Sequence, residues 1–237
     1  MAPTRRHTWD PQDYAAHSGP QQAWARELIA RLRLTGRERL LDVGCGEGKV
    51  TAELAAALPH GWVTGIDSSA EMIDYARRHF GPPHHPHLEF LQMDARAIQL
   101  PMTYDVVFSN AALHWVDGHR AFLRGAATAL RPGGRLLVSC GGRGNAEGVL
   151  RATRAVMRDP RWRDAFRGMR KPYFFHRPDP YADWLKKAGF QATAARLVPK
   201  EMLLAHRTAF VGWVRTTWIP YTQRLPEPLR EEFVLAV

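Results

Sequence analysis

The sequence predicts an α/β protein built on a doubly wound, mostly parallel sheet. Short apolar runs alternate with longer amphipathic patterns over residues 38–142, a glycine-rich turn follows the first run, and an acidic residue ends the second. Alternation of this kind gives right-handed crossovers between parallel strands, with helices on both faces of the sheet. A ligand is then expected beyond the carboxyl ends of the strands.

The first half of this unit contains two strands and two helices. The run ERLLDVG indicates a buried strand, and KVTAELAAALP indicates a helix that Pro59 ends. WVTGID is the second strand. Ser68 or Ser69 then caps a helix over AEMIDYARRHF, with Glu71 in its first turn.

The second half supplies three more strands. HLEFLQMD and YDVVFSN are the third and fourth strands, and both are bounded by turn residues. HRAFLRGAATAL has apolar residues at helical spacing and ends at RPGG, which is a strong stop signal. GRLLVSC is the fifth strand, and it completes a core domain over residues 38–142.

Two segments flank this core and are expected to form a lid. Residues 1–37 contain an aromatic arm and an amphipathic helix with Trp24, Leu28 and Leu32 on one face. Residues 143–237 are expected to hold the substrate lid and the rest of the sheet. The patterns in this segment predict helices over Ala146–Met157, Tyr181–Ala188, Thr208–Arg215 and Glu227–Val237, and a strand near Phe190–Leu197.

Composition excludes several classes of protein. Lys plus Arg exceed Asp plus Glu by 33 − 23 = 10, but the arginines are spread in ones and twos, which favours a solvated surface over a nucleic-acid partner. No apolar run reaches membrane-spanning length and no secretory signal is visible, so we expect a cytoplasmic protein without membrane contact, a monomer or homodimer. Cys45 and Cys140 lack paired spacing and predict no disulfide. The histidines of HFGPPHHPH lack a frame for ligation, so no metal is expected.

The strongest motif is LLDVGCGEGK, at the end of the first strand. Gly44, Gly46 and Gly48 let the backbone approach a ligand closely and present amides at a helix N-terminus. Asp67 ends the next strand, 67 − 48 = 19 residues after the last glycine, where a carboxylate can bind both ribose hydroxyls. A dinucleotide fingerprint is the alternative, but its spacing is G-x-G-x-x-G, and here the third glycine comes one residue early.

The pattern D-x-G-x-G-x-G from Asp42 to Gly48 resembles motif I of the class I S-adenosylmethionine-dependent methyltransferases. The resemblance implies a Rossmann-like fold, S-adenosylmethionine as methyl donor and S-adenosylhomocysteine as product. It also implies that an acidic residue after the third strand contacts the adenine and that the segment after the fourth lines the catalytic cleft. The expected donor-binding residues are Tyr14, Asp42, Gly44, Cys45, Gly46, Gly48, Asp67, Ser68, Met72, Asp94, Ala95 and Asn110.

A narrower resemblance rests on W-D-P-x-x-Y near the N-terminus and FSNAALHWV after the fourth strand. Together these segments resemble the carboxyl methyltransferases that act on trans-aconitate, juvenile hormone acid or malonyl-carrier protein. The resemblance implies that Tyr14 and the arm close over the donor, while Gln21, His114 and Trp115 face the acceptor. Position 21 is a glutamine in two of these groups and an arginine in the trans-aconitate enzymes. The family also has a last antiparallel strand beside the fifth, whereas this chain stops at EEFVLAV, so we expect a truncated sheet or one completed differently.

The acceptor decides which catalytic groups are needed. A carboxylate has an unperturbed pKa of about 4 and requires no general base at neutral pH, whereas a hydroxyl requires one, and His114 is then the candidate. We expect methylation of a small, anionic carboxylate, positioned by His114 and Trp115, with Arg143 and Tyr173 as further substrate-binding residues. Three alternatives stay open: methylation of a small-molecule nitrogen or hydroxyl, methylation of RNA, and a fold that binds the donor without turnover.

Overall fold

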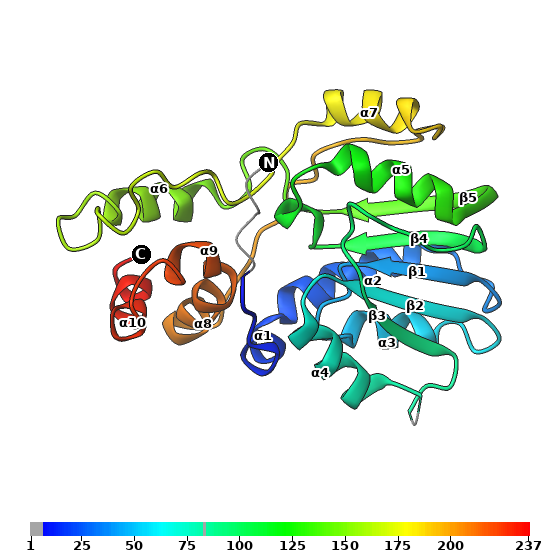
Figure 1. Cartoon of the computed structure of the whole chain (residues 1–237), viewed down its shortest axis with the longest axis horizontal. Coiled ribbons are helices and arrows are strands. Elements are labelled where there is room, and N and C mark those ends of the chain that lie inside the picture. The colour runs from blue at the N-terminus through cyan, green and yellow to red at the C-terminus, as the bar shows by residue number, and fades with distance from the viewer. Residues whose placement is uncertain (1–6, 83) are drawn as a thin grey trace.

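The computed structural model describes residues 7–82 and 84–237. Its sheet consists of five parallel strands in the order β3-β2-β1-β4-β5 (Figure 1). The order changes direction between β1 and β4, which places the topological switch point at their C-terminal ends. The predicted doubly wound parallel sheet is confirmed. The strands are β1 (Arg39–Val43), β2 (Trp62–Asp67), β3 (Leu88–Gln92), β4 (Tyr104–Asn110) and β5 (Leu130–Ser139).

Helices cover both faces of the sheet because its central strands are apolar on both sides. In β1, Leu40 packs in a cluster with residues of α2, α3 and α4, whereas its neighbour Leu41 packs with residues of α5 and α7. Successive side chains of a strand point to opposite faces, so one strand contributes to both cores. These helices are α2 (Gly19–Leu32), α3 (Lys49–Ala56), α4 (Ala70–Phe80), α5 (His119–Ala129) and α7 (Pro178–Lys187).

Local signals set where these elements begin and end. The Ser69 hydroxyl accepts a hydrogen bond from the Met72 amide at 3.2 Å, so Ser69 rather than Ser68 caps α4. The helix stop at RPGG is confirmed, because α5 ends at Ala129. The fifth strand, however, begins earlier than predicted and includes RPGG. Its register against β4 shifts there, so these extra residues are accommodated as an irregularity at the strand's start.

The flanking segments are mostly helical. In the arm, α1 (Pro11–His17) precedes α2. The helices α6, α8, α9 and α10 lie to one side of the sheet (Figure 1) and contribute to a third apolar core, in which Trp162 and Phe233 have ring centroids 5.7 Å apart. The four helices predicted after residue 142 are confirmed. The elements of this side group are α6 (Glu147–Val156), α8 (Arg207–Thr217), α9 (Ile219–Thr222) and α10 (Glu227–Ala236).

The strand expected near Phe190–Leu197 does not form, and that prediction is wrong. The Phe190 amide instead donates to the Leu185 carbonyl at 3.0 Å and closes α7. From 191 to 206 the chain is irregular and exposed along most of its length, because QATAARLV has few β-branched residues and pairs with no strand. The described residues after 142 therefore add no strand to the sheet, and only an isolated bridge joins His176 to Gly142.

Three further observations concern the described residues as a whole. None of their helices combines the length and apolarity needed to cross a bilayer. No group of three or more His, Cys, Asp or Glu side chains in them is arranged to hold a metal ion. Cys45 and Cys140 are both free thiols.

Candidate active site

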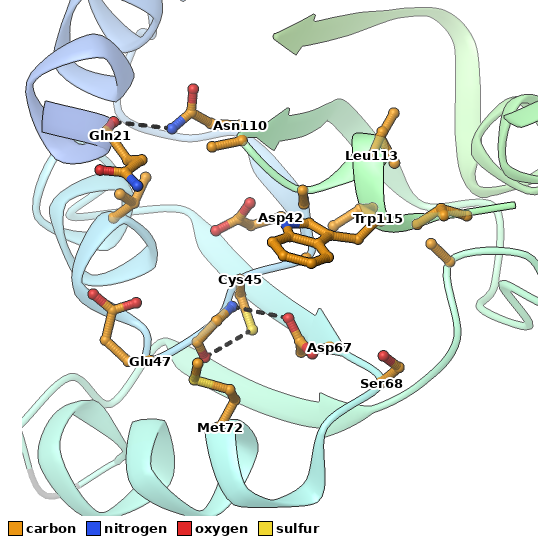
Figure 2. A pocket seen from close by; sticks show the side chains of 18 of the residues that line it. Gln21, Asp42, Cys45, Glu47, Asp67, Ser68, Met72, Asn110, Leu113 and Trp115 are labelled. Carbon is orange, nitrogen blue, oxygen red and sulfur yellow. Dashed lines mark hydrogen bonds between the residues drawn. The ribbon is translucent and has the colours of Figure 1, made fainter. Parts of the chain in front are cut away.

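A cavity lies at the C-terminal ends of β1, β2, β3 and β4, next to the arm formed by α1 and α2 (Figure 2). The carboxyl ends of parallel strands meet at one edge of the sheet, which is why residues from four separate motifs come together there. Most residues singled out from the sequence line this cavity. They are Tyr14, Gln21, Asp42, Gly44, Cys45, Gly46, Asp67, Ser68, Met72, Asp94, Ala95, Asn110 and Trp115.

The glycine turn after β1 brings the backbone to the cavity. Gly44 has a φ of +77°, and a Cβ at this position would collide with the Cβ of Ala112 in the turn after β4. The amides of Gly44 and Cys45 donate to the Ile66 carbonyl at 2.7 and 3.0 Å, which ties the turn to β2. Gly48 does not line the cavity. It precedes α3, where a side chain would press against residues of α4 and β3.

Two buried carboxylates flank this turn. Asp42 accepts a hydrogen bond from the Thr51 hydroxyl at 2.8 Å, and burial raises its pKa to about 7. Glu47 accepts one from the Ser18 hydroxyl at 3.1 Å, and burial raises the pKa of this carboxyl as well. Both shifts reflect the cost of a negative charge away from water, so a cationic ligand would stabilise the charged forms.

Two further acids follow β2 and β3. Asp67 accepts a hydrogen bond from the Gly46 amide at 3.1 Å (Figure 2) and another from the Ser69 amide at 2.9 Å, and burial raises its pKa despite these bonds. Asp94 lines the cavity and forms an ion pair with Arg96 at 2.6 Å. The cavity edge along β1, β2 and β3 is therefore rich in carboxylates.

The turn after β4 forms the opposite, neutral wall. The Asn110 side chain donates to the backbone carbonyl of Gln21 at 3.1 Å (Figure 2), which joins β4 to α2. Ala111 has a φ of +54°, a left-handed conformation that costs a non-glycine residue about 1–2 kcal/mol. The side-chain Oε1 of Gln21 is buried without a hydrogen-bond partner among the described residues. Buried polar atoms are normally paired, so this amide marks a place for a ligand.

Aromatic rings complete this wall. Trp9 lies edge-on between Tyr14 and Trp115, with ring centroids 5.6 and 5.0 Å away, and all three line the cavity. Burial raises the pKa of the Tyr14 hydroxyl above its usual range, so this group stays protonated. The arm thus covers the cavity with uncharged rings.

His114 is in the 3-10 turn η1 (Leu113–Trp115) but is not one of the cavity-lining residues. Its Nδ1 accepts a hydrogen bond from the Gly141 amide at 3.2 Å, and its ring contacts the ring of Phe175 at a centroid distance of 5.9 Å. Burial lowers the pKa of His114 to about 4. The ring is therefore neutral near pH 7, with its proton on Nε2.

The two residues expected to bind an anionic acceptor also lie outside the cavity. The Tyr173 hydroxyl donates to the Thr217 carbonyl at 2.7 Å, and its ring packs against Trp115 from the side of the helices after β5. Arg143 is exposed, and its amide donates to the His176 carbonyl at 3.0 Å. Neither residue is among those that line the cavity.

Several lining residues were not singled out from the sequence. Most are immediate neighbours of assigned residues in the same turn. Their place next to a motif could therefore have indicated that they line the cavity. Trp9 was visible as the first residue of W-D-P-x-x-Y. These residues are Trp9, Ser18, Gln22, Val43, Glu47, Val50, Met93, Ala111, Ala112, Leu113 and Val116.

The side chains present fit S-adenosylmethionine. Its sulfonium and amino groups are cationic, and buried Asp42 and Glu47 and partly buried Asp67 supply carboxylates at the cavity edge where the backbone comes closest. Asp67 stands at the end of β2, the position from which a carboxylate binds ribose hydroxyls. The chain itself therefore provides counter-charges for such a donor.

Comparison with known proteins agrees with this geometry. A family model for a methyltransferase domain matches residues 40–134. The chain is 33% identical to a trans-aconitate 2-methyltransferase of Streptomyces coelicolor, over 91% of this chain and 72% of that protein. It is also 33% identical to one of Paracidovorax citrulli, over 97% of this chain and 87% of that protein.

Solved structures share the fold at lower identity. Phosphoethanolamine N-methyltransferase 2 of Haemonchus contortus, in complex with S-adenosyl-L-methionine, matches with a TM-score of 0.60 and 19% identity, over 76% of this chain and 41% of that chain. The strand order, the glycine turn and the relatives at 33% identity thus lead to one family. The chain is an enzyme that belongs to the S-adenosylmethionine-dependent methyltransferases.

Proposed function

We propose that this enzyme transfers the methyl group to a carboxylate oxygen of a small organic acid. The observation that carries the proposal is the absence of a general base from the wall formed by the arm and the turn after β4. Among the described residues that line the cavity, those of this wall include no Lys, His, Asp or Glu, and the cavity's carboxylates all lie on the opposite, donor side. A carboxylate is already ionised near neutral pH and needs no base, whereas a hydroxyl or an ammonium group must lose a proton.

The position of His114 supports the same acceptor. Its Nδ1 lone pair is engaged by the Gly141 amide, and its remaining proton-carrying nitrogen can donate but not accept a proton. His114, the candidate base for a hydroxyl acceptor, is thus not arranged as a base. The relatives named as trans-aconitate 2-methyltransferases make trans-aconitate the first acid to test.

The chain contributes electrostatics, orientation and exclusion of water. When bound, the donor supplies an activated methyl group on a cationic sulfonium. Asp42 and Asp67 stabilise that cation, while Trp9 and Trp115 keep water from the reacting carboxylate. The Gln21 amide, rotated by a half-turn, presents its NH2 group and orients the carboxylate by a hydrogen bond.

The proposal also assigns roles to the flanking segments. The arm before β1 covers the donor, and the helices after β5 form the outer boundary through which the acceptor enters. Since the acceptor wall is neutral, the attraction for an anionic acceptor comes from the donor's positive charge. A neutral amide at position 21 favours an acceptor with a single carboxylate at that place.

The test is methyl transfer from labelled S-adenosylmethionine to separate pools of carboxylic acids, amines with phenols, and RNA. The acid pool contains trans-aconitate, dicarboxylic acids and apolar monocarboxylic acids. We expect label only in the acid pool, released by alkali as a volatile product, which identifies a methyl ester. An Asp67→Ala variant, in which donor binding is impaired, controls for background. Alkali-stable label in another pool, or no transfer to any acid by an enzyme that binds the donor, overturns the proposal.

A further inference from the structure

A second cavity lies on the other side of the arm, between α1 and the helices α8, α9 and α10. Trp9 and Tyr14 line both this cavity and the donor cavity. The same two residues therefore separate the donor from the C-terminal helices. Contacts on the outer side of the arm therefore also determine where the rings of Trp9 and Tyr14 lie on its inner side.

An ion pair on the outer side connects α1 to α8. The Arg215 guanidinium donates to both carboxylate oxygens of Asp13, from Nε at 2.7 Å and from Nη2 at 2.6 Å. These hydrogen bonds are the main reason why the pKa of Asp13 is lowered. The side chain of Arg215 is 41% exposed and that of Asp13 is 24% exposed, so the pair remains accessible to water and salt. A forked contact of this kind fixes orientation as well as distance.

Two more contacts fix the arm to the same helices. The Thr8 amide donates to the Gln223 side-chain oxygen at 3.2 Å, and the Gln223 side-chain nitrogen donates to the Thr8 carbonyl at 2.5 Å. The His17 ring lies directly against Gly212 of α8, where a side chain would collide with it. The outer face of the arm is thus held at its start, middle and end.

The inner face is held by the glycine turn. The Lys49 ammonium donates to the Ala15 carbonyl at 2.5 Å, and Ser18 donates to Glu47 beside the donor cavity. Neighbouring residues of a helix point about 100° apart, so Asp13 faces α8 while Tyr14 faces the cavity. α1 therefore spans the gap between the sheet domain and the C-terminal helices.

We propose that Arg215 is a positioning residue, which acts through Asp13 to hold Trp9 and Tyr14 over the bound donor. The inference rests on the proposed function in one respect, namely that the cavity lined by Trp9 and Tyr14 is the site of methyl transfer. Its predicted consequence is that the Asp13–Arg215 pair slows release of the donor. A purely structural role for the pair would instead lower the stability of the fold and leave donor release unchanged.

The fold does not depend on this pair for its core. The C-terminal helices bury a separate apolar cluster that includes Trp162, Trp218 and Phe233, and Arg215 is not part of it. Loss of one partly exposed ion pair from such a structure typically changes stability little. Variants at Asp13 and Arg215 are therefore expected to fold.

The experiment measures donor binding by the full chain, without an acceptor. The variants are Arg215→Gln, Arg215→Lys, Asp13→Asn and the exchange Asp13→Arg with Arg215→Asp, and exposed Arg163→Gln controls for the loss of one cation. Calorimetry gives the dissociation constant of S-adenosylmethionine, and stopped-flow tryptophan fluorescence gives its dissociation rate. Thermal unfolding reports stability for each variant.

We expect Arg215→Gln and Asp13→Asn to raise the dissociation rate and the dissociation constant of the donor about fivefold. Arg215→Lys is expected to give intermediate values, because lysine keeps the charge but lacks the forked guanidinium. The exchange variant is expected to recover both values to within about twofold. Added salt is expected to speed donor release from the unchanged protein and from Arg163→Gln, but not from Arg215→Gln.

Unchanged donor release in both single variants overturns the inference. A lowered melting temperature with unaltered release, or a defect that the exchange variant does not recover, assigns the pair a structural role only and overturns it as well. If Arg215→Gln does not fold, Arg215→Lys and Gln223→Ala test the same contacts with smaller changes. Because these readouts need only the donor, an enzyme that esterifies no acid contradicts the proposed function and leaves this inference standing.

Discussion

The two halves of the cavity differ in charge and in construction. The donor half consists of backbone turns and of carboxylates at the ends of β1 and β2, among them buried Asp42 and partly buried Asp67. The acceptor half consists of neutral side chains from α2 and from the turn after β4, among them Gln21, Leu113 and Trp115. Hydrogen bonds within one sheet hold the donor half, whereas contacts between distant segments of the chain hold the acceptor half.

The difference shows how one site can serve ligands of opposite charge. A cationic donor is stabilised by the carboxylates, and the donor in turn attracts an anionic acceptor across a wall that carries no competing charge. Substitutions in the donor half are therefore expected to change donor affinity. Substitutions in the acceptor half are expected to change the KM of the acceptor and to leave the donor bound.

The largest effect is expected from Gly44→Ala. A methyl group here meets the Cβ of Ala112 and is attached to a backbone with φ of +77°, so we expect the free energy of unfolding to fall by about 3 kcal/mol. Gly46→Ala is the matched control, because Gly46 also has a positive φ, +55°, but no atom lies within 4 Å of the added carbon. For this variant we expect the free energy of unfolding to fall by only about 1 kcal/mol. Chemical denaturation measures both. Equal losses contradict the close approach of the two turns.

Asp67→Asn removes the charge from the end of β2 and keeps the shape of the side chain. Hydrogen bonds to charged groups contribute about 1.5–3 kcal/mol, so we expect the dissociation constant of S-adenosylmethionine to rise about thirtyfold in calorimetry. Asp74→Asn, at an exposed position of α4, is the control and is expected to bind the donor normally. If Asp67→Asn binds as tightly as the control does, the donor half is wrongly assigned.

Gln21→Ala tests the acceptor half. Removing an amide that orients the acceptor carboxylate is expected to raise the acceptor KM about tenfold, since one hydrogen bond to a charged group is lost. The donor dissociation constant is expected to stay within twofold of its original value. Steady-state kinetics with the acid found in the transfer assay gives the first value, and exposed Gln12→Ala is the control. A change confined to donor affinity would move Gln21 into the donor half.

The smallest effect is expected from His114→Gln. The pKa of His114 is lowered to about 4, so its ring is neutral throughout the pH range from about 5.5 to 8.5 and titrates no proton there. We expect kcat to fall by no more than about threefold, and we expect the pH profiles of both proteins to lack a limb near 6.5. A limb at this pH in the original enzyme that disappears in the variant indicates base catalysis and a hydroxyl acceptor.

The donor half is also the part of the site that the sequence predicts most completely. Gly44, Gly46 and Asp67 belong to short segments whose spacing carries their meaning, and each lies at a strand end where parallel pairing brings it to the cavity. The alternation of elements predicts parallel strands joined by right-handed crossovers, so the class of the sheet could be predicted as well. The irregular start of β5 could not be predicted, because the shift in its register arises only from pairing with β4.

The acceptor half was harder to predict because neighbours in sequence diverge in space. Within η1, Leu113 and Trp115 line the cavity while His114 points to Phe175, since successive residues of a tight helical turn face different directions. Tyr173 and Arg143 come from segments whose position depends on the packing of the C-terminal helices. No local pattern reports that packing.

The missing strand near Phe190–Leu197 shows, for a whole element, that contacts between distant segments decide a structure that the local sequence pattern does not reveal. A stretch with weak alternation becomes a strand only if a neighbouring strand accepts its backbone hydrogen bonds. Here the segment after α7 makes no such bonds with β5, although Leu197 approaches Gly142 at the end of that strand. Pairing is a property of two segments, and a single segment does not reveal it.

The most direct test of the account is the origin of the oxygen atom that receives the methyl group. The acid identified in the transfer assay is labelled with heavy oxygen in its carboxyl groups, converted by the enzyme and then hydrolysed with alkali. Alkali cleaves the bond between the acyl carbon and the ester oxygen, so methyl transfer to a carboxylate predicts methanol that carries the heavy oxygen. Methanol without the label, or a methylated product that releases no methanol, contradicts carboxylate methylation.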